Sequence, residues 1–88
     1  MAVLVRAALG MSTEQYEEVS KGLEPQVRQA PGFVAHVGYV EDDGVHIYEV
    51  WNSREQYDRW FEEAIRPNFP ADAAGNMDVL EVIKLVLP

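Results

Sequence analysis

The side chains in this sequence best suited to chemistry are His36, Glu49 and Trp51, which lie in two neighbouring strand-like runs. A histidine beside a carboxylate can act as a general base, because the carboxylate fixes the tautomer of the ring and stabilises its charged form. His36 and Glu49 are therefore the candidate catalytic pair, with His36 removing the proton of an acidic phenol or enol. The competing interpretation is a structural pair that only satisfies two polar groups within a sheet.

Whether these residues meet depends on the register of a predicted β-hairpin. Its strands are the β-branched and aromatic runs at 33–40 and 45–51, joined by Asp-Asp-Gly, a connection typical of tight turns. A two-residue loop would place His36, Glu49 and Trp51 on one face of the sheet, because side chains alternate between the faces.

A three-residue loop with a bulge at Gly44 is the alternative register. It would group His36 with His46 and Tyr48 and leave the carboxylate and the indole among apolar residues. The two-residue loop also brings Gly38 to the candidate face, where the missing side chain leaves room for a ligand. The sequence leaves both registers open.

The elements that must position these residues follow the order β-α-β-β-α-β. This order predicts an α+β protein with the ferredoxin-like βαββαβ arrangement, a four-stranded antiparallel sheet with two helices, formed by residues 1–88 as a single domain. Predicted strands span 2–9, 33–40, 45–51 and 79–87; the second helix runs from Arg54 to about Ile65, and a loop covers 66–78.

Both helices begin at sequences typical of a capping box. Ser12 with Gln15, and Ser53 with Gln56, can each satisfy backbone N–H groups of a first helical turn. Pro25 lies inside the pattern of the first helix and predicts a kink or break just before it. The apolar stripe expected to be buried on that helix consists of Tyr16, Val19, Leu23 and Val27.

Composition excludes several classes of protein. A net charge of −8 argues against binding to nucleic acid or to anionic membranes. The chain has no cysteine, which excludes disulfides and thiolate metal sites. His36 and His46 lack a clear third ligand, so we expect no metal and no cofactor. The short apolar start carries Arg6 and does not resemble a signal peptide, so a cytoplasmic protein is expected.

The predicted strands are apolar at both alternating positions, although two helices can cover only one face of the sheet. An exposed apolar face of this size is unusual in a monomer. The simplest cover is a second copy related by two-fold symmetry. We therefore predict a homodimer whose shared core contains Phe33, Val37, Tyr39 and residues of the 79–87 strand.

Three segments of the chain resemble the antibiotic-biosynthesis-monooxygenase-like (ABM-like) family of dimeric α/β barrel proteins. They are Pro31-Gly32-Phe33, Glu49-Val50-Trp51 and Ser53-Arg54-Glu55-Gln56-Tyr57. Some members of that family oxidise aromatic polyketides without metal or flavin, some degrade haem, and many have no known activity. The resemblance implies the dimeric barrel fold over nearly the whole chain.

The haem-degrading members carry an Asn on the first strand, a Trp at the end of the third and a His on the second helix. Trp51 matches the Trp. The first strand of this sequence has no Asn, and the helix from Arg54 to Ile65 has no His. These departures predict that the protein does not ligate haem.

The resemblance and the candidate residues together favour a small cofactor-independent monooxygenase acting on an aromatic or polyketide-type molecule. In that hypothesis His36 and Glu49 generate the substrate anion, Trp51 and Tyr57 stack on its ring, and Arg6 steadies its charge if its strand register agrees. The alternative is a non-catalytic dimeric module that binds a small molecule or serves in a stress response. The sequence leaves open whether the protein is an enzyme.

Overall fold

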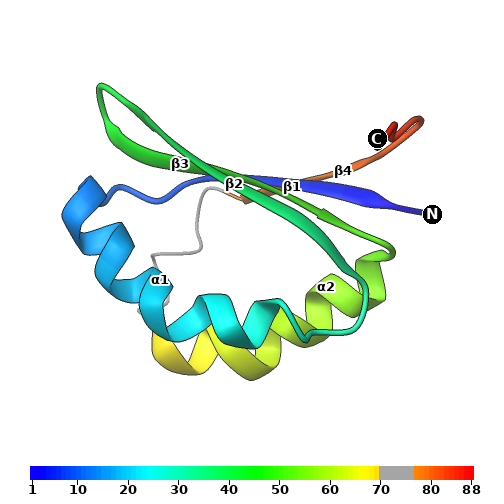
Figure 1. Cartoon of the computed structure of the whole chain (residues 1–88), viewed down its shortest axis with the longest axis horizontal. Coiled ribbons are helices and arrows are strands. Elements are labelled where there is room, and N and C mark those ends of the chain that lie inside the picture. Colours follow the sequence, from blue (N-terminus) through cyan, green and yellow to red (C-terminus); the bar gives the residue numbers. More distant parts are fainter. Residues whose placement is uncertain (70–76) are drawn as a thin grey trace.

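The computed structural model describes residues 1–69 and 77–88, and within them a four-stranded sheet carries two α-helices on one face (Figure 1). The strands are β1 (Val3–Ala8), β2 (Phe33–Glu41), β3 (Gly44–Trp51) and β4 (Met77–Glu81). The helices are α1 (Thr13–Val27) and α2 (Arg54–Trp60), and α2 continues through a π-helical turn (Phe61–Ile65) into a short 3₁₀ turn (Arg66–Asn68). The strand order is β2-β3-β1-β4 and neighbouring strands are antiparallel, which confirms the predicted ferredoxin-like arrangement.

The hairpin between β2 and β3 has the two-residue loop. His36 lies opposite Glu49, and the loop consists of Asp42 and Asp43. Gly44 follows the loop with φ of 115°, a conformation that favours glycine. The three-residue alternative, which would have grouped His36 with the even-numbered residues of β3, is wrong.

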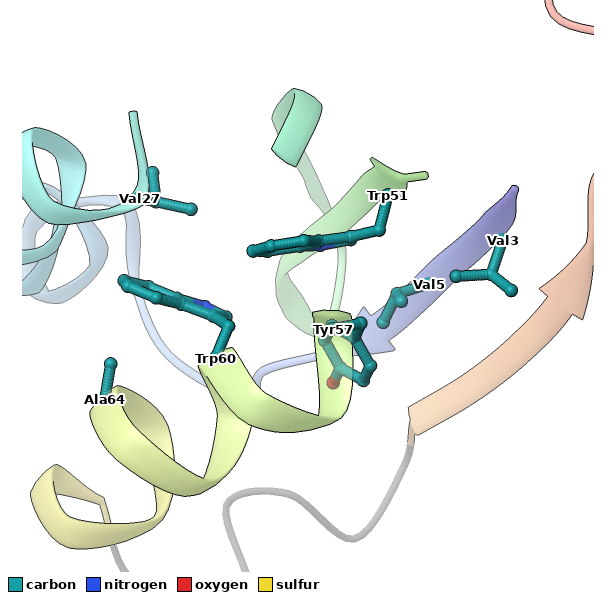
Figure 2. Packing of buried hydrophobic residues seen from close by; sticks show 7 residues of the cluster. All are labelled: Val3, Val5, Val27, Trp51, Tyr57, Trp60 and Ala64. Carbon is teal, nitrogen blue, oxygen red and sulfur yellow. The ribbon is translucent and has the colours of Figure 1, made fainter. Parts of the chain in front are cut away.

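The core lies between the sheet and α2, and it is centred on Trp51. This indole has no exposed surface, and it packs edge-on against Tyr57, with 5.8 Å between ring centroids. Figure 2 shows it above Tyr57 and Trp60, with Val5 of β1 beside it. Several large rings thus fill the space where α2 meets β1 and β3.

Helix α1 runs unbroken through Pro25, so the predicted break into two pieces is wrong, and the kink stays a prediction. The proline falls in the last turn, where the helix loses only one backbone hydrogen bond. At the start of α1, Ser12 and Gln15 form the predicted capping box. At the start of α2 the serine side chain accepts from the backbone N–H of Gln56, but the glutamine side chain contacts the serine hydroxyl instead of completing the box.

The last strand is shorter than predicted, because its partner ends. β4 pairs with β1 as far as Glu81, and one further hydrogen bond joins the backbone N–H of Val82 to the carbonyl of Ala2. Beyond that point only Met1 remains on the side of β1, so the strand predicted over 79–87 stops at Glu81. The loop predicted over 66–78 is also wrong at its two ends, where the structure has the 3₁₀ turn and the start of β4. Residues 70–76 of this loop lie outside the described part of the chain.

The second face of the sheet is uncovered in the single chain. Val37 and Leu80 on this face are 55% and 39% exposed. Phe33, predicted to lie there too, instead packs edge-on against Trp51 on the helix side, at 5.4 Å between ring centroids. A register shift between Phe33 and Ala35 turns the start of β2 and explains the difference.

Among the described residues, none of the helices has both the length and the apolar character needed to cross a membrane.

Candidate functional site

His36, Glu49 and Trp51 form a hydrogen-bonded chain on the helix-facing side of the sheet. The imidazole Nδ1 lies 2.7 Å from Glu49 Oε2, and the indole N–H of Trp51 donates to Glu49 Oε1 at 3.0 Å. Glu49 is only 8% exposed, yet both of its oxygens are used. Because an ionised carboxylate can only accept, Nδ1 must carry a proton, which leaves the Nε2 lone pair of neutral His36 free to act as a base.

Tyr16 of α1 meets this lone pair. Its hydroxyl is hydrogen-bonded to Nε2 of His36, which extends the chain to Tyr16–His36–Glu49–Trp51. Burial raises the pKa of Tyr16, and the carboxylates of Glu49 and Glu24 raise it further. The phenol therefore stays neutral and acts as the donor.

Gly38 allows Tyr16 to come this close. A β-carbon at position 38 would lie 2.7 Å from the Tyr16 hydroxyl oxygen, closer than atoms of this kind approach one another. The sequence predicted that this glycine leaves room for a ligand. That prediction is wrong for the structure as it stands, because the Tyr16 ring occupies the room.

A cavity of about 570 Å³ lies between α1 and the sheet, and His36, Glu49 and Tyr16 contribute to its wall. This volume is typical of sites for small organic molecules. The rest of the wall is mainly apolar and includes Leu23, Val27, Phe33, Trp60, Ile65 and Met77. Glu24 of α1 and Arg28, which caps the end of this helix, also line it, and they pair with each other at 2.7 Å. The cavity thus offers apolar surface with one hydrogen-bonding corner.

Comparison with solved structures places this architecture among known proteins. SnoaB, a cofactor-independent oxygenase from Streptomyces nogalater, matches in a mutant form with a TM-score of 0.65 and 14% identity over 97% of this chain and 94% of its own. A candidate antibiotic biosynthesis monooxygenase from Nitrosomonas europaea matches with a TM-score of 0.67 and 17% identity over 96% and 100%. The chain has the ABM-like fold.

A third match is the heme-degrading protein Rv3592 from Mycobacterium tuberculosis, with a TM-score of 0.61 and 24% identity over 98% of this chain and 99% of its own. No protein-family model matches the sequence, and no curated protein matches it either. At these identities the likeness concerns the fold, so the chemistry has to be argued from the site.

Within this ABM-like fold, Arg6 lies on the wrong face for the role suggested by the sequence. It stands opposite Tyr48 in the register, on the uncovered side of the sheet, and pairs with Asp78 at 3.1 Å. The role suggested for Arg6 required a strand register that puts its side chain on the same face as His36 and Glu49. The observed register puts it on the other face. Arg6 therefore cannot steady an anion in the cavity.

Trp51 and Tyr57 are not among the residues that line the cavity. Trp51 is wholly buried and holds Glu49, and Tyr57 donates its hydroxyl to the sulfur of Met77 at 2.6 Å. Burial raises the pKa of Tyr57, and Glu49 raises it further. The aromatic rings that do line the cavity include Phe33 and Trp60.

Sequence reasoning missed Tyr16 as a site residue and assigned it to the buried stripe of α1. Its hydroxyl was the only available signal, since a stripe residue with a polar tip needs a hydrogen-bond partner when it is buried. The partner could not be identified, because the pairing of α1 with β2 depends on how the helix lies across the sheet.

His46 belongs to a separate cluster at the hairpin. Its Nε2 lies 2.6 Å from Asp43 and 3.6 Å from Glu41, and its ring stacks on Tyr39. The hydrogen bond with Asp43 raises the pKa of His46, and the same bond lowers the pKa of Asp43. His46 therefore holds the turn closed and does not reach the cavity.

Proposed function

We propose that the protein is a small cofactor-independent monooxygenase that acts on an aromatic or polyketide-type molecule in the cavity between α1 and the sheet. The observation that carries this proposal is the hydrogen bond between His36 and Glu49 in the cavity wall. The buried carboxylate of Glu49 accepts a hydrogen bond from Nδ1, which leaves Nε2 as the basic atom, and the ring lies in the wall of a largely apolar cavity of organic-molecule size. SnoaB, described as a cofactor-independent oxygenase, shares the fold.

The proposed reaction begins with proton transfer from an acidic phenol, enol or activated CH₂ group to His36 Nε2. Glu49 stabilises the imidazolium that forms. The substrate anion gives electrons to O₂, and a hydroperoxide forms at carbon. Loss of water from this hydroperoxide leaves a carbonyl group, so one oxygen atom stays in the product, the other leaves as water, and the substrate supplies all the electrons.

The aromatic contacts in this proposal come from Phe33 and Trp60, which line the cavity. Trp51 acts indirectly in this proposal. Its indole N–H positions the carboxylate of Glu49, and that carboxylate positions His36. Haem degradation, the activity named for Rv3592, is not proposed, since the helix His and the strand Asn typical of haem-degrading members are missing from this sequence.

The second candidate function is a non-catalytic dimeric module that binds a small molecule or acts in a stress response. One observation favours it: Nε2 of His36 already has a partner in Tyr16. A binding module would keep this contact when the cavity is filled, whereas an enzyme must break it.

Oxygen uptake distinguishes the two functions. An anthrone, an aromatic ketone with an acidic CH₂ group, should be consumed with one O₂ per molecule, without added metal or flavin. With ¹⁸O₂, one labelled atom should appear in the product carbonyl. Tight binding of the anthrone without oxygen uptake above the buffer rate would favour the binding module and contradict the enzyme.

We also propose that two copies pair through the uncovered face of the sheet. Val37 and Leu80 expose apolar surface there, and Ile83 and Val86 in the following segment are 98% and 80% exposed. Apolar surface of this extent is best covered by another apolar surface, and an identical chain provides one.

Sedimentation equilibrium at micromolar concentration should therefore give twice the 9.9 kDa of one chain. Val37→Glu should give monomers, since it places a charge on the shared face. Val40→Glu is the matched control, because Val40 is 64% exposed on the same strand but stands opposite Val45 on the helix side. A monomeric wild type, or equal effects of the two variants, would disprove this interface.

A further inference from the structure

Tyr16 occupies the one atom that the proposed reaction needs. Nε2 of His36 must accept the substrate proton, yet in this structure it accepts a hydrogen bond from the Tyr16 phenol. The two rings are nearly parallel, with 8° between their planes and 6.1 Å between their centroids. At that separation the rings meet edge to edge, so the hydroxyl approaches along the ring edge where the Nε2 lone pair lies.

The surroundings of Tyr16 suit a side chain that can move its hydroxyl away from His36. One side of its hydroxyl rests over Gly38, where no side chain holds it. Tyr16 also lines the cavity between α1 and the sheet. No hydrogen bond other than that to His36 ties the hydroxyl to the described part of the chain. The hydroxyl is therefore held by one hydrogen bond, which a competing hydroxyl can replace.

We propose that Tyr16 is a latch on His36, and that the substrate opens it by putting its own hydroxyl, conjugated to an electron-withdrawing group such as a carbonyl, in the place of the Tyr16 phenol. This proposal rests on the proposed function and adds to it the residue that selects among aromatic ligands. A resident phenol shows that the corner of the cavity accepts an aromatic hydroxyl in the orientation needed for proton transfer.

The selectivity follows from comparing the two hydroxyls. When an ordinary phenol displaces the Tyr16 hydroxyl from His36, one hydrogen bond is lost and a similar one forms, so the net gain in binding free energy is small. A conjugated hydroxyl is a stronger donor, and its O–H bond breaks as the proton moves to Nε2. The bonding electrons stay on the substrate oxygen, and the imidazolium pairs with Glu49, which gives a charge-assisted bond that Tyr16 cannot match. The latch thus rejects weakly acidic rings that fit the apolar wall.

The test measures binding of 4-nitrophenol, an acidic phenol whose phenolate absorbs visible light, and of 4-nitroanisole, its methyl ether without the hydroxyl. Tyr16→Phe removes the competing hydroxyl, and Gly38→Ala displaces it while keeping the tyrosine. Both variants should bind 4-nitrophenol roughly threefold to tenfold more tightly than the wild type, the range that one net hydrogen bond gives. Binding of 4-nitroanisole should not change, and Tyr39→Phe, on the opposite face of the sheet, should behave as the wild type.

The outcomes separate this proposal from the function on which it rests. His36→Gln should weaken 4-nitrophenol binding and abolish the phenolate absorption. If it does so but Tyr16→Phe binds no more tightly than the wild type, the latch proposal is wrong, and His36 remains the proposed base. If His36→Gln binds the phenol as well as the wild type does, His36 is not the base and both proposals fail. Tighter binding of the anisole and the phenol alike in Tyr16→Phe would show that the ring only fills space, and would overturn the latch.

Discussion

Replacing His36 with glutamine should lower the rate of substrate-dependent oxygen uptake by about 10²- to 10⁴-fold, the range typical of a lost general base. The glutamine amide can still donate a hydrogen bond to Glu49, so the buried carboxylate keeps a partner. It cannot take a proton near neutral pH, which is what the reaction requires. Initial rates in an oxygen electrode, with the far-ultraviolet circular dichroism of each variant as a check on folding, measure the effect.

His46→Gln is the matched control for this variant. It makes the same chemical change in the second histidine, which pairs with Asp43 at the hairpin and lies away from the cavity. Its oxygen-uptake rate should stay within a few-fold of the wild-type rate. A His36→Gln protein that keeps its fold and most of its activity would show that another group removes the proton.

Trp51→Ala should lower the free energy of unfolding by about 3–5 kcal/mol, the loss typical when a large buried aromatic ring is truncated. The side chain is wholly buried, and its removal also leaves Glu49 Oε1 without its donor. In a domain of 88 residues such a loss is a large part of the total stability. Urea denaturation followed by circular dichroism measures the change.

Two phenylalanine variants separate packing from hydrogen bonding at this site. Trp51→Phe keeps an aromatic ring but loses the N–H that serves Glu49, whereas Trp60→Phe loses similar volume in the same cluster. Trp51→Phe should be the less stable by about 1–3 kcal/mol, the penalty for an unpaired buried acceptor. Equal stability of the two variants would mean that Glu49 does not depend on the indole.

The sequence predicted the part of the site that local turn chemistry determines. Asp-Asp-Gly allows few hairpin registers, and the one adopted places His36 opposite Glu49 with Trp51 two residues along the same face. Alternation along a single hairpin therefore identified three of the four members of the hydrogen-bonded chain. Pairing between strands that are close in sequence is constrained by their loop, which left two registers open here, and the structure has the two-residue loop.

The features that sequence reasoning missed depend on pairing between distant segments. Arg6 was placed by the register of β1 on β3, which no short loop fixes. Tyr16 found its partner only because α1 lies across β2 at Gly38. The length of β4 was set by where β1 ends, although the β-propensity of its sequence continues beyond that point. Each of these outcomes is a property of tertiary packing, and propensity carries little information about it.

The uncovered apolar face and the exposed segment after β4 also bear on solubility. A single chain presents Val37, Leu80, Ile83 and Val86 to water, and such surface attracts other apolar surfaces without discrimination. The net charge of −8 opposes this, because copies that repel one another at a distance meet less often in wrong orientations. The acidic surface thus serves as colloidal protection, and this protection fades as the pH approaches the isoelectric point near 4.5.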